Sequence, residues 1–81
     1  MSMAERVRDF IIDEAQWDRS REHLTDDYPL LENGLIDSLG IFHLVSFLES
    51  EFGVEVQDEE LVPENFGTIA NIAQLVASKR S

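Results

Sequence analysis

The chain has 81 residues, the size of one small domain, and no cysteine, which excludes a disulfide and a thiolate site. Six Lys and Arg residues against seventeen Asp and Glu give a formal net charge of −11, which disfavours nucleic acid and anionic membranes as partners. No stretch approaches the ~18 apolar residues of a membrane span, and the charged N-terminus has no signal-peptide core, so we expect a cytoplasmic protein without membrane insertion.

The acids are concentrated in the middle of the chain. All six basic residues lie outside residues 22–64, whereas twelve of the acids lie inside that range. A surface of one sign is often only a solvated face, but it also attracts basic patches on other proteins. We therefore expect partner docking in this part of the chain.

The first expected helix spans residues 3–16. Its apolar residues recur with helical spacing, at Met3, Val7, Phe10 and Ile11. Ser2 is a suitable N-cap, and Glu5 suits the positive end of the helix dipole. Trp17 ends the pattern, and we expect it to pack over the end of the helix.

A long polar connection follows, over residues 18–37. Leu24, Leu30 and Leu31 are expected to anchor it to the core, and Asn33-Gly34 predicts a turn. Loops of this length in compact domains usually have a function.

The second expected helix spans residues 38–52, with Asp37 as N-cap and Gly53 at its end. Its main apolar stripe comprises Leu39, Phe42, Leu44, Val45, Leu48 and Phe52, with Ile41 and Phe47 outside it. Because the helix is apolar on more than one side, we expect two of its faces to make contacts. One face packs in the core, and the other binds a partner or cargo, unless the helix is buried centrally between its neighbours.

The last third predicts a connector and further helical segments. Residues 54–56 are expected to be extended, residues 57–62 to form a turn capped by Asp58, and residues 63–66 to form another. A final helix over residues 68–79 has Thr68 or Gly67 as its cap and one apolar stripe. These elements predict an all-α fold in one domain, residues 1–81. It is a small antiparallel bundle of three main helices plus a short helix, with a long loop between the first and second helices.

The motif Gly34-Leu35-Ile36-Asp37-Ser38-Leu39 places a hydroxyl at the expected start of the second helix, beside an acid. It resembles the phosphopantetheine attachment motif of acyl carrier proteins, and the similarity extends from about Leu30 to Val76. The resemblance implies a 4′-phosphopantetheine arm on Ser38, with Asp37 assisting a phosphopantetheinyl transferase and its magnesium ion during loading. It further implies a non-enzymatic carrier that holds acyl or aminoacyl thioesters for biosynthetic enzymes.

The sequence departs from typical fatty-acid carriers directly after Ser38-Leu39. Those proteins have several acids along the front of the helix, whereas here the first acid is Glu49. We therefore expect a specialised stand-alone carrier of acyl, aminoacyl, peptidyl or D-alanyl groups. Its partners would be the transferase, a loading ligase and downstream enzymes with basic docking patches, and the carrier itself would be a monomer. We expect partner recognition at Leu39, Ile41, Phe42, Glu49, Glu59 and Glu60.

Other functions are less well supported. Ser38 and His43 would lie about 140° apart around a helix, and no Gly-x-Ser-x-Gly elbow is present, which disfavours a serine hydrolase. Two histidines twenty residues apart form no zinc pattern, and the acids lack the spacing of a calcium loop, so no metal site is expected. An unmodified acidic helical interaction domain remains as the alternative.

Overall fold

The computed structural model describes residues 2–80 and contains helices but no strand within that range. The helices are α1 (Met3–Glu14), α2 (Ser38–Phe52), α3 (Pro63–Phe66) and α4 (Ile69–Arg80), with 3₁₀ turns η1 (Arg21–His23) and η2 (Asp58–Glu60). The prediction of an all-α fold with three main helices and a short one is confirmed.

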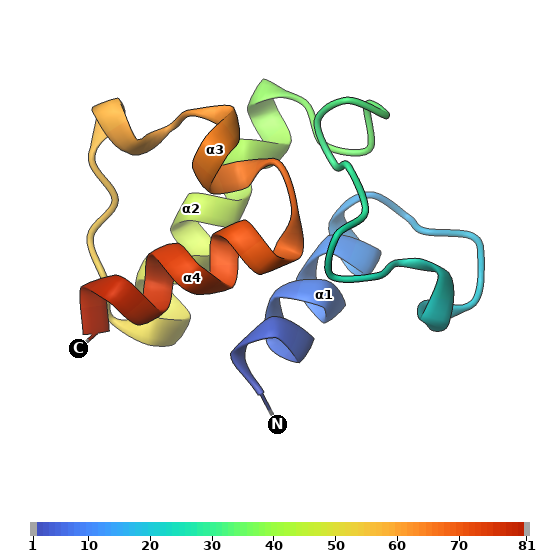
Figure 1. The fold of residues 1–81 in the computed structure, drawn as a ribbon, viewed down its shortest axis with the longest axis horizontal. Coiled ribbons are helices and arrows are strands. Elements are labelled where there is room, and N and C mark those ends of the chain that lie inside the picture. Colours follow the sequence, from blue (N-terminus) through green and yellow to red (C-terminus); the bar gives the residue numbers. More distant parts are fainter. Residues whose placement is uncertain (1, 81) are drawn as a thin grey trace.

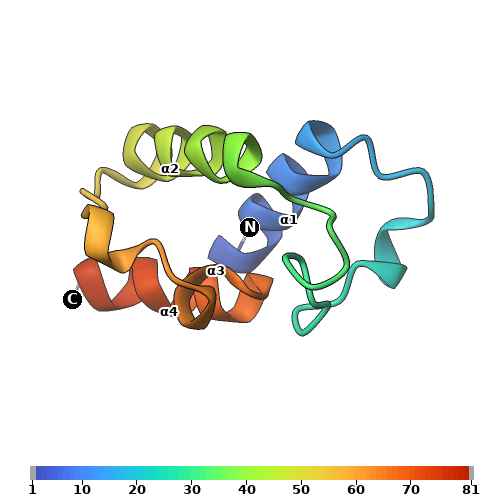
Figure 2. The same cartoon turned by 90° about the horizontal axis from the view of Figure 1, so that it is seen from above.

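The three long helices surround one core (Figures 1 and 2). α1 packs against α4 and α2, and α3 packs against α4. In Figure 2, α2 and α4 run in the same general direction, and α1 runs against both. The long connection between α1 and α2 covers one end of the bundle.

The core is apolar and includes three side chains from that connection. Among the described residues no polar or charged side chain is buried. The buried apolar residues are Val7, Ile11, Leu24, Leu30, Ile36, Leu44, Leu48, Phe66, Ile69, Ile72 and Val76. Because Leu24, Leu30 and Ile36 lie between helices, the connection is itself part of the core.

α1 begins as predicted and ends earlier than expected. The Ser2 hydroxyl accepts a hydrogen bond from Glu5 N–H at 3.1 Å, and the Glu5 carboxylate accepts one from Ser2 N–H at 3.3 Å. The hydrogen bond from the Ser2 backbone N–H, and then the contact with the Ser2 side chain, hold the pKa of the Glu5 carboxyl below its usual value. The helix stops at Glu14 because Gln16 adopts a left-handed backbone, with φ 53°, that cannot continue it.

Trp17 lies beyond the end of α1 and joins it to the connection. Its indole N–H donates to the Ser20 carbonyl at 3.1 Å, and its ring meets Tyr28 edge-on, with centroids 5.4 Å apart. Its backbone N–H donates to the Ile12 carbonyl at 3.0 Å. The Trp17 ring thus contacts the connection, and its packing over the helix end stays a prediction.

The apolar stripe of α2 is not buried in its first turns. Leu39 and Phe42 are 62% and 59% exposed. Phe47, expected outside the stripe, instead stacks on Phe10 of α1 with ring centroids 4.5 Å apart. A helix that is apolar nearly all round has no face that its period alone selects, so the packing of α1 decides which side is buried.

The other helix ends follow local chemistry, with one correction. Gly53 is left-handed, with φ 69°, and the Thr68 hydroxyl accepts a hydrogen bond from Asn71 N–H at 3.1 Å, so Thr68 rather than Gly67 caps α4. Asp58 was predicted to cap the η2 turn, but Gln57 does so. Its N–H donates to Glu60 Oε1 at 2.9 Å, so the side chain of the last residue of the turn satisfies the backbone group just before its start.

Candidate functional site

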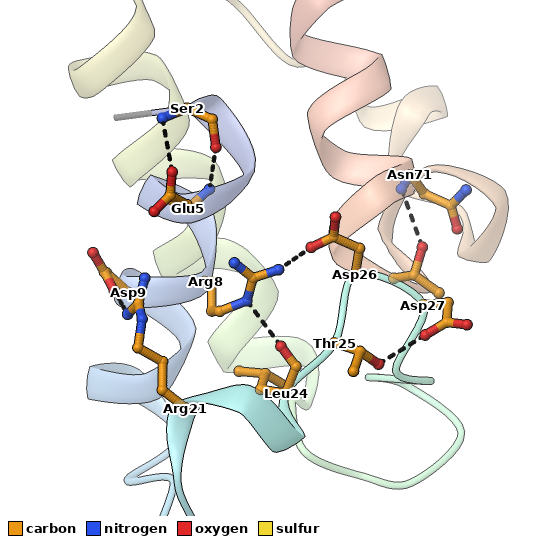
Figure 3. Close-up of polar contacts among 11 residues, drawn as sticks. Ser2, Glu5, Arg8, Asp9, Arg21, Leu24, Thr25, Asp26, Asp27 and Asn71 are labelled. Atoms are coloured by element: carbon orange, nitrogen blue, oxygen red, sulfur yellow. Dashed lines mark hydrogen bonds and ion pairs between the residues drawn. The ribbon is translucent and has the colours of Figure 1, made fainter.

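The connection that leads to Ser38 is fastened to α1 by Arg8 (Figure 3). Arg8 Nε donates to the Leu24 carbonyl at 2.8 Å, and its guanidinium also pairs with Asp26. The Arg8 side chain is only 16% exposed, whereas Asp26 is largely exposed. A nearby second pair joins Arg21 of η1 to Asp9 of α1.

Two backbone hydrogen bonds fasten the same connection to the junction of α3 and α4. Leu30 N–H donates to the Gly67 carbonyl at 2.8 Å, and Ala70 N–H donates to the Asp26 carbonyl at 2.9 Å. The irregular segment is therefore held by three different helical elements. Some of its backbone N–H and C=O groups thus obtain from these elements the hydrogen bonds that a helix or sheet would otherwise supply.

A tight turn then brings the chain to the start of α2. Leu35 N–H donates back to the Leu30 carbonyl at 2.9 Å, and Gly34 has φ 70°, a conformation that glycine adopts at little cost. The turn leaves Ile36 almost fully buried. Burial of Ile36 fixes where the next two residues, Asp37 and Ser38, emerge.

Asp37 caps α2, as predicted. Its Oδ1 accepts a hydrogen bond from Gly40 N–H at 2.9 Å, and its carbonyl accepts one from Ile41 N–H, also at 2.9 Å. Ser38 is the first residue of the helix and is exposed. The two consecutive residues that the motif singled out therefore lie at the start of α2.

This arrangement fits a phosphodiester on the Ser38 hydroxyl. The N-terminal end of a helix carries a partial positive charge and unpaired N–H groups, which stabilise a phosphate. Because Ser38 is exposed, a bulky group on its oxygen displaces no packed side chain. The capping bond uses Asp37 Oδ1, and the carboxylate retains its second oxygen for other contacts.

Close packing at Gly40 supports the same turn. A β-carbon on Gly40 would lie 2.9 Å from Ile36 Cγ2 and 3.5 Å from Asp37 Oδ1. Glycine therefore allows the first turn of α2 to sit directly on the buried end of the loop. No role for this glycine was predicted from the sequence.

The residues expected to recognise partners lie in different environments. Leu39 and Phe42 are exposed, whereas Ile41 is half-buried against the core. Glu49 is exposed, and its carboxylate accepts a hydrogen bond from Val56 N–H at 3.1 Å. Glu59 is exposed on η2.

Glu60 has structural contacts of its own. Its Oε1 lies 2.7 Å from Lys79 Nζ of α4 and accepts the Gln57 N–H. The hydrogen bond from Lys79, and then that from Gln57, lowers the pKa of Glu60. Glu60 therefore joins η2 to the end of α4, whatever else it contacts.

Neither histidine is placed to activate Ser38. His43 Nδ1 lies 2.6 Å from Glu14 Oε2 at the end of α1, and His23 Nδ1 lies 3.2 Å from the Ser20 hydroxyl. Over residues 2–80, no group of three or more potential ligand side chains could hold a metal ion. No helix in that range has the length and apolarity to cross a membrane.

Arg8 and Asp26 position the site but were not singled out from the sequence. The sequence indicates only a long polar connection, and long-range pairs leave no periodic signal. The one available clue is that Arg8 lies beside the apolar stripe of α1 and is therefore close to the core.

Comparison with known proteins agrees with this geometry. A family model described as "Phosphopantetheine attachment site" matches residues 5–76. The chain belongs to this family of carrier proteins. A relative named "Probable acyl carrier protein PigG", from Serratia sp. (strain ATCC 39006), is 37% identical over 59 residues, covering 73% of this chain and 68% of the relative.

Solved carrier structures have the same fold. The holo acyl carrier protein of Nitrosomonas europaea, solved by NMR, is 28% identical with a TM-score of 0.80, over 99% of this chain and 98% of that one. The apo form of KstB-PCP is 32% identical, also with a TM-score of 0.80, over 100% of this chain and 89% of that one. The cofactor of this carrier is thus covalently attached phosphopantetheine, and the protein holds thioester intermediates for biosynthetic enzymes.

Proposed function

We propose that Ser38 is the attachment site of the 4′-phosphopantetheine arm. The observation that carries this proposal is the exposed Ser38 hydroxyl at the first position of α2, directly after the capping Asp37. The arm supplies the thiol that this cysteine-free chain lacks. The chain itself provides the anchoring oxygen, a helix end that stabilises the phosphate, and a surface for partners.

Asp37 has a second role in this proposal. The carboxylate oxygen that does not cap α2 would contact the magnesium ion that the transferase brings during loading, since carboxylates are preferred magnesium ligands. Structural and loading roles would then depend on different properties of one side chain. Capping needs an acceptor oxygen, and the metal contact needs negative charge.

The carrier is proposed to act as a single, monomeric, non-catalytic domain in the cytoplasm. Its partners would be a phosphopantetheinyl transferase, a ligase that loads an acyl or aminoacyl group, and downstream biosynthetic enzymes. The absence of acids between Ser38 and Glu49 supports a specialised pathway rather than general fatty-acid synthesis. Leu39, Ile41, Phe42, Glu49, Glu59 and Glu60 are the residues proposed to contact these partners.

The test is intact mass after incubation with coenzyme A and a broad-specificity phosphopantetheinyl transferase. The native chain should gain the mass of one phosphopantetheine group, and Ser38→Ala should gain none. Ser46→Ala is the matched control, because Ser46 is an exposed serine on the same helix. A native chain that stays unmodified would instead support the unmodified interaction domain.

A further inference from the structure

Contacts at four-residue spacing join α1 to α2 along one side of the bundle. They are Arg6 with Glu51, Phe10 with Phe47, and Glu14 with His43. The order is antiparallel, as expected from Figure 2, where α1 runs against α2. Because side chains four residues apart lie on the same face of a helix, these contacts form one row, which fixes the register of the two helices.

A groove of about 550 Å³ lies along this row. Its lining includes the rings of Phe10 and Phe47 and the charged side chains of Arg6, Asp9, Asp13 and Glu51. The lining therefore has three acids and one base. The Asp9 and Glu51 carboxylates are already paired with arginines. In contrast, no hydrogen bond or ion pair within residues 2–80 involves the exposed Asp13 carboxylate.

The far end of the aromatic row already binds a guanidinium from this chain. Phe47 meets Phe52 edge-on, with ring centroids 6.1 Å apart, and the Arg80 guanidinium carbon of α4 lies 5.9 Å from the Phe52 centroid. The Arg19 guanidinium lies over the Trp17 ring in the same way, at 5.3 Å. Contact between an arginine and an aromatic surface is thus a recurrent interaction of this protein.

We propose that the groove binds an arginine-bearing segment of a partner protein. The aliphatic stem of the partner's arginine lies against Phe10 and Phe47, and its guanidinium pairs with Asp13. Charge favours such a segment over an acidic one or a second copy of this chain. The chain carries a net charge of −11, and the nearby Arg6 and Arg21 are already paired with acids.

The groove lies away from Ser38. Phe47 follows Ser38 by nine residues, which places the two about 180° apart around α2 and about 14 Å apart along its axis. A segment seated at Phe47 therefore leaves Ser38 exposed. The partner in the groove can hold the carrier while the arm on Ser38 visits other enzymes. Only this consequence rests on the proposed function, because binding in the groove needs no arm.

The probe is a synthetic peptide of about 15 residues, which is four helical turns, with leucine and arginine side chains on one face. Titrated into the isotope-labelled native chain, it should shift the amide NMR signals of residues 6–13 and 47–51 and leave those of η2 and α3 in place. Asp13→Asn should weaken binding by roughly fivefold, the upper range for one exposed charge pair. Asp58→Asn is the matched control, because it removes the same charge from an exposed site outside the groove, and it should weaken binding less than about twofold.

A peptide of the same composition in scrambled order keeps the charge but loses the shared leucine and arginine face. If it binds equally well, or if Asp13→Asn and Asp58→Asn have the same effect, general attraction to an acidic chain explains the binding and the proposal is overturned. The absence of any shift at about 1 mM peptide, where even a weak site is largely filled, also overturns it. Ser38→Ala should bind the peptide as the native chain does, so a failure of groove binding and a failure of loading at Ser38 are separate results.

Discussion

Gly40 faces Ile36 so closely that a β-carbon at position 40 would lie 2.9 Å from Ile36 Cγ2. This contact joins the first turn of α2 to the buried end of the loop. Cγ2 is attached at the branched β-carbon of a side chain that is 5% exposed, so it cannot swing away freely.

Gly40→Ala should therefore destabilise the protein, although alanine is the better helix former. Overpacking costs about 1–3 kcal/mol, and the gain from replacing a helical glycine offsets about 0.5–1 kcal/mol. The net loss should be about 1 kcal/mol in urea unfolding followed by Trp17 fluorescence. Combining it with Ile36→Leu, which lacks Cγ2, should recover part of that loss, and additive effects in the double variant would contradict the proposed contact.

Asp37 variants separate capping from loading. Asp37→Ala should lose about 1 kcal/mol of stability through loss of the cap. Asp37→Asn retains an oxygen for Gly40 N–H, so its stability should stay near native. Its loading rate should nevertheless fall, because the neutral amide is a poorer magnesium contact. If Asp37→Asn is loaded at the native rate, the carboxylate has only its capping role.

Arg8 should be the most important polar side chain for the long connection. Arg8→Met keeps an aliphatic chain but removes the donor to the Leu24 carbonyl, and we expect a loss of about 1.5–3 kcal/mol, typical of a hydrogen bond from a charged group. Asp26→Asn removes only the exposed ion pair and should cost less than about 1 kcal/mol. Urea unfolding measures both, and equal losses in the two variants would contradict a dominant role for the Leu24 contact.

Glu60 makes a pH-dependent contribution to stability. Its pKa is lowered in the folded protein, chiefly by the hydrogen bond from Lys79, so the carboxylate form is favoured by folding. The contribution is present above the usual pKa of 4.5 and is lost as the pH falls through the lower, folded value. Glu60→Gln should thus be less stable than the native protein near pH 7, and the difference should shrink in acid.

Urea unfolding at a series of pH values measures this difference. Glu59→Gln is the control, because it removes a neighbouring charge on η2 without removing the Lys79 or Gln57 contact. A gap between native and Glu60→Gln that stays constant down to strongly acidic pH would show that the contacts of Glu60 do not depend on its charge.

What the sequence predicted well was local. Ser2, Asp37 and Gly53 act within a few residues of themselves, so their capping roles could be inferred from chemistry and position. The placement of Asp37 and Ser38 at a helix start could likewise be predicted, because it depends only on where α2 begins. Leu24 and Leu30 were also correctly expected to be core anchors.

What the sequence did not predict depends on distant partners. The buried face of α2 is chosen by the packing of α1, through contacts such as Phe10 with Phe47. The fastening of the connection depends on Arg8, which contacts residues sixteen and eighteen positions away. Local periodicity carries no information on either, because both are set by how the helices meet in three dimensions.

The hydrogen bonds from Leu30 to Gly67 and from Ala70 to Asp26 couple the opening of the connection to the opening of the C-terminal part of the chain. Neither part can open without breaking hydrogen bonds of the other, so amide exchange in both should follow the same cooperative event. The proposed arm on Ser38 would then start from a fixed point, and the distance that a thioester travels between enzymes would come from motion of the arm and of the whole domain.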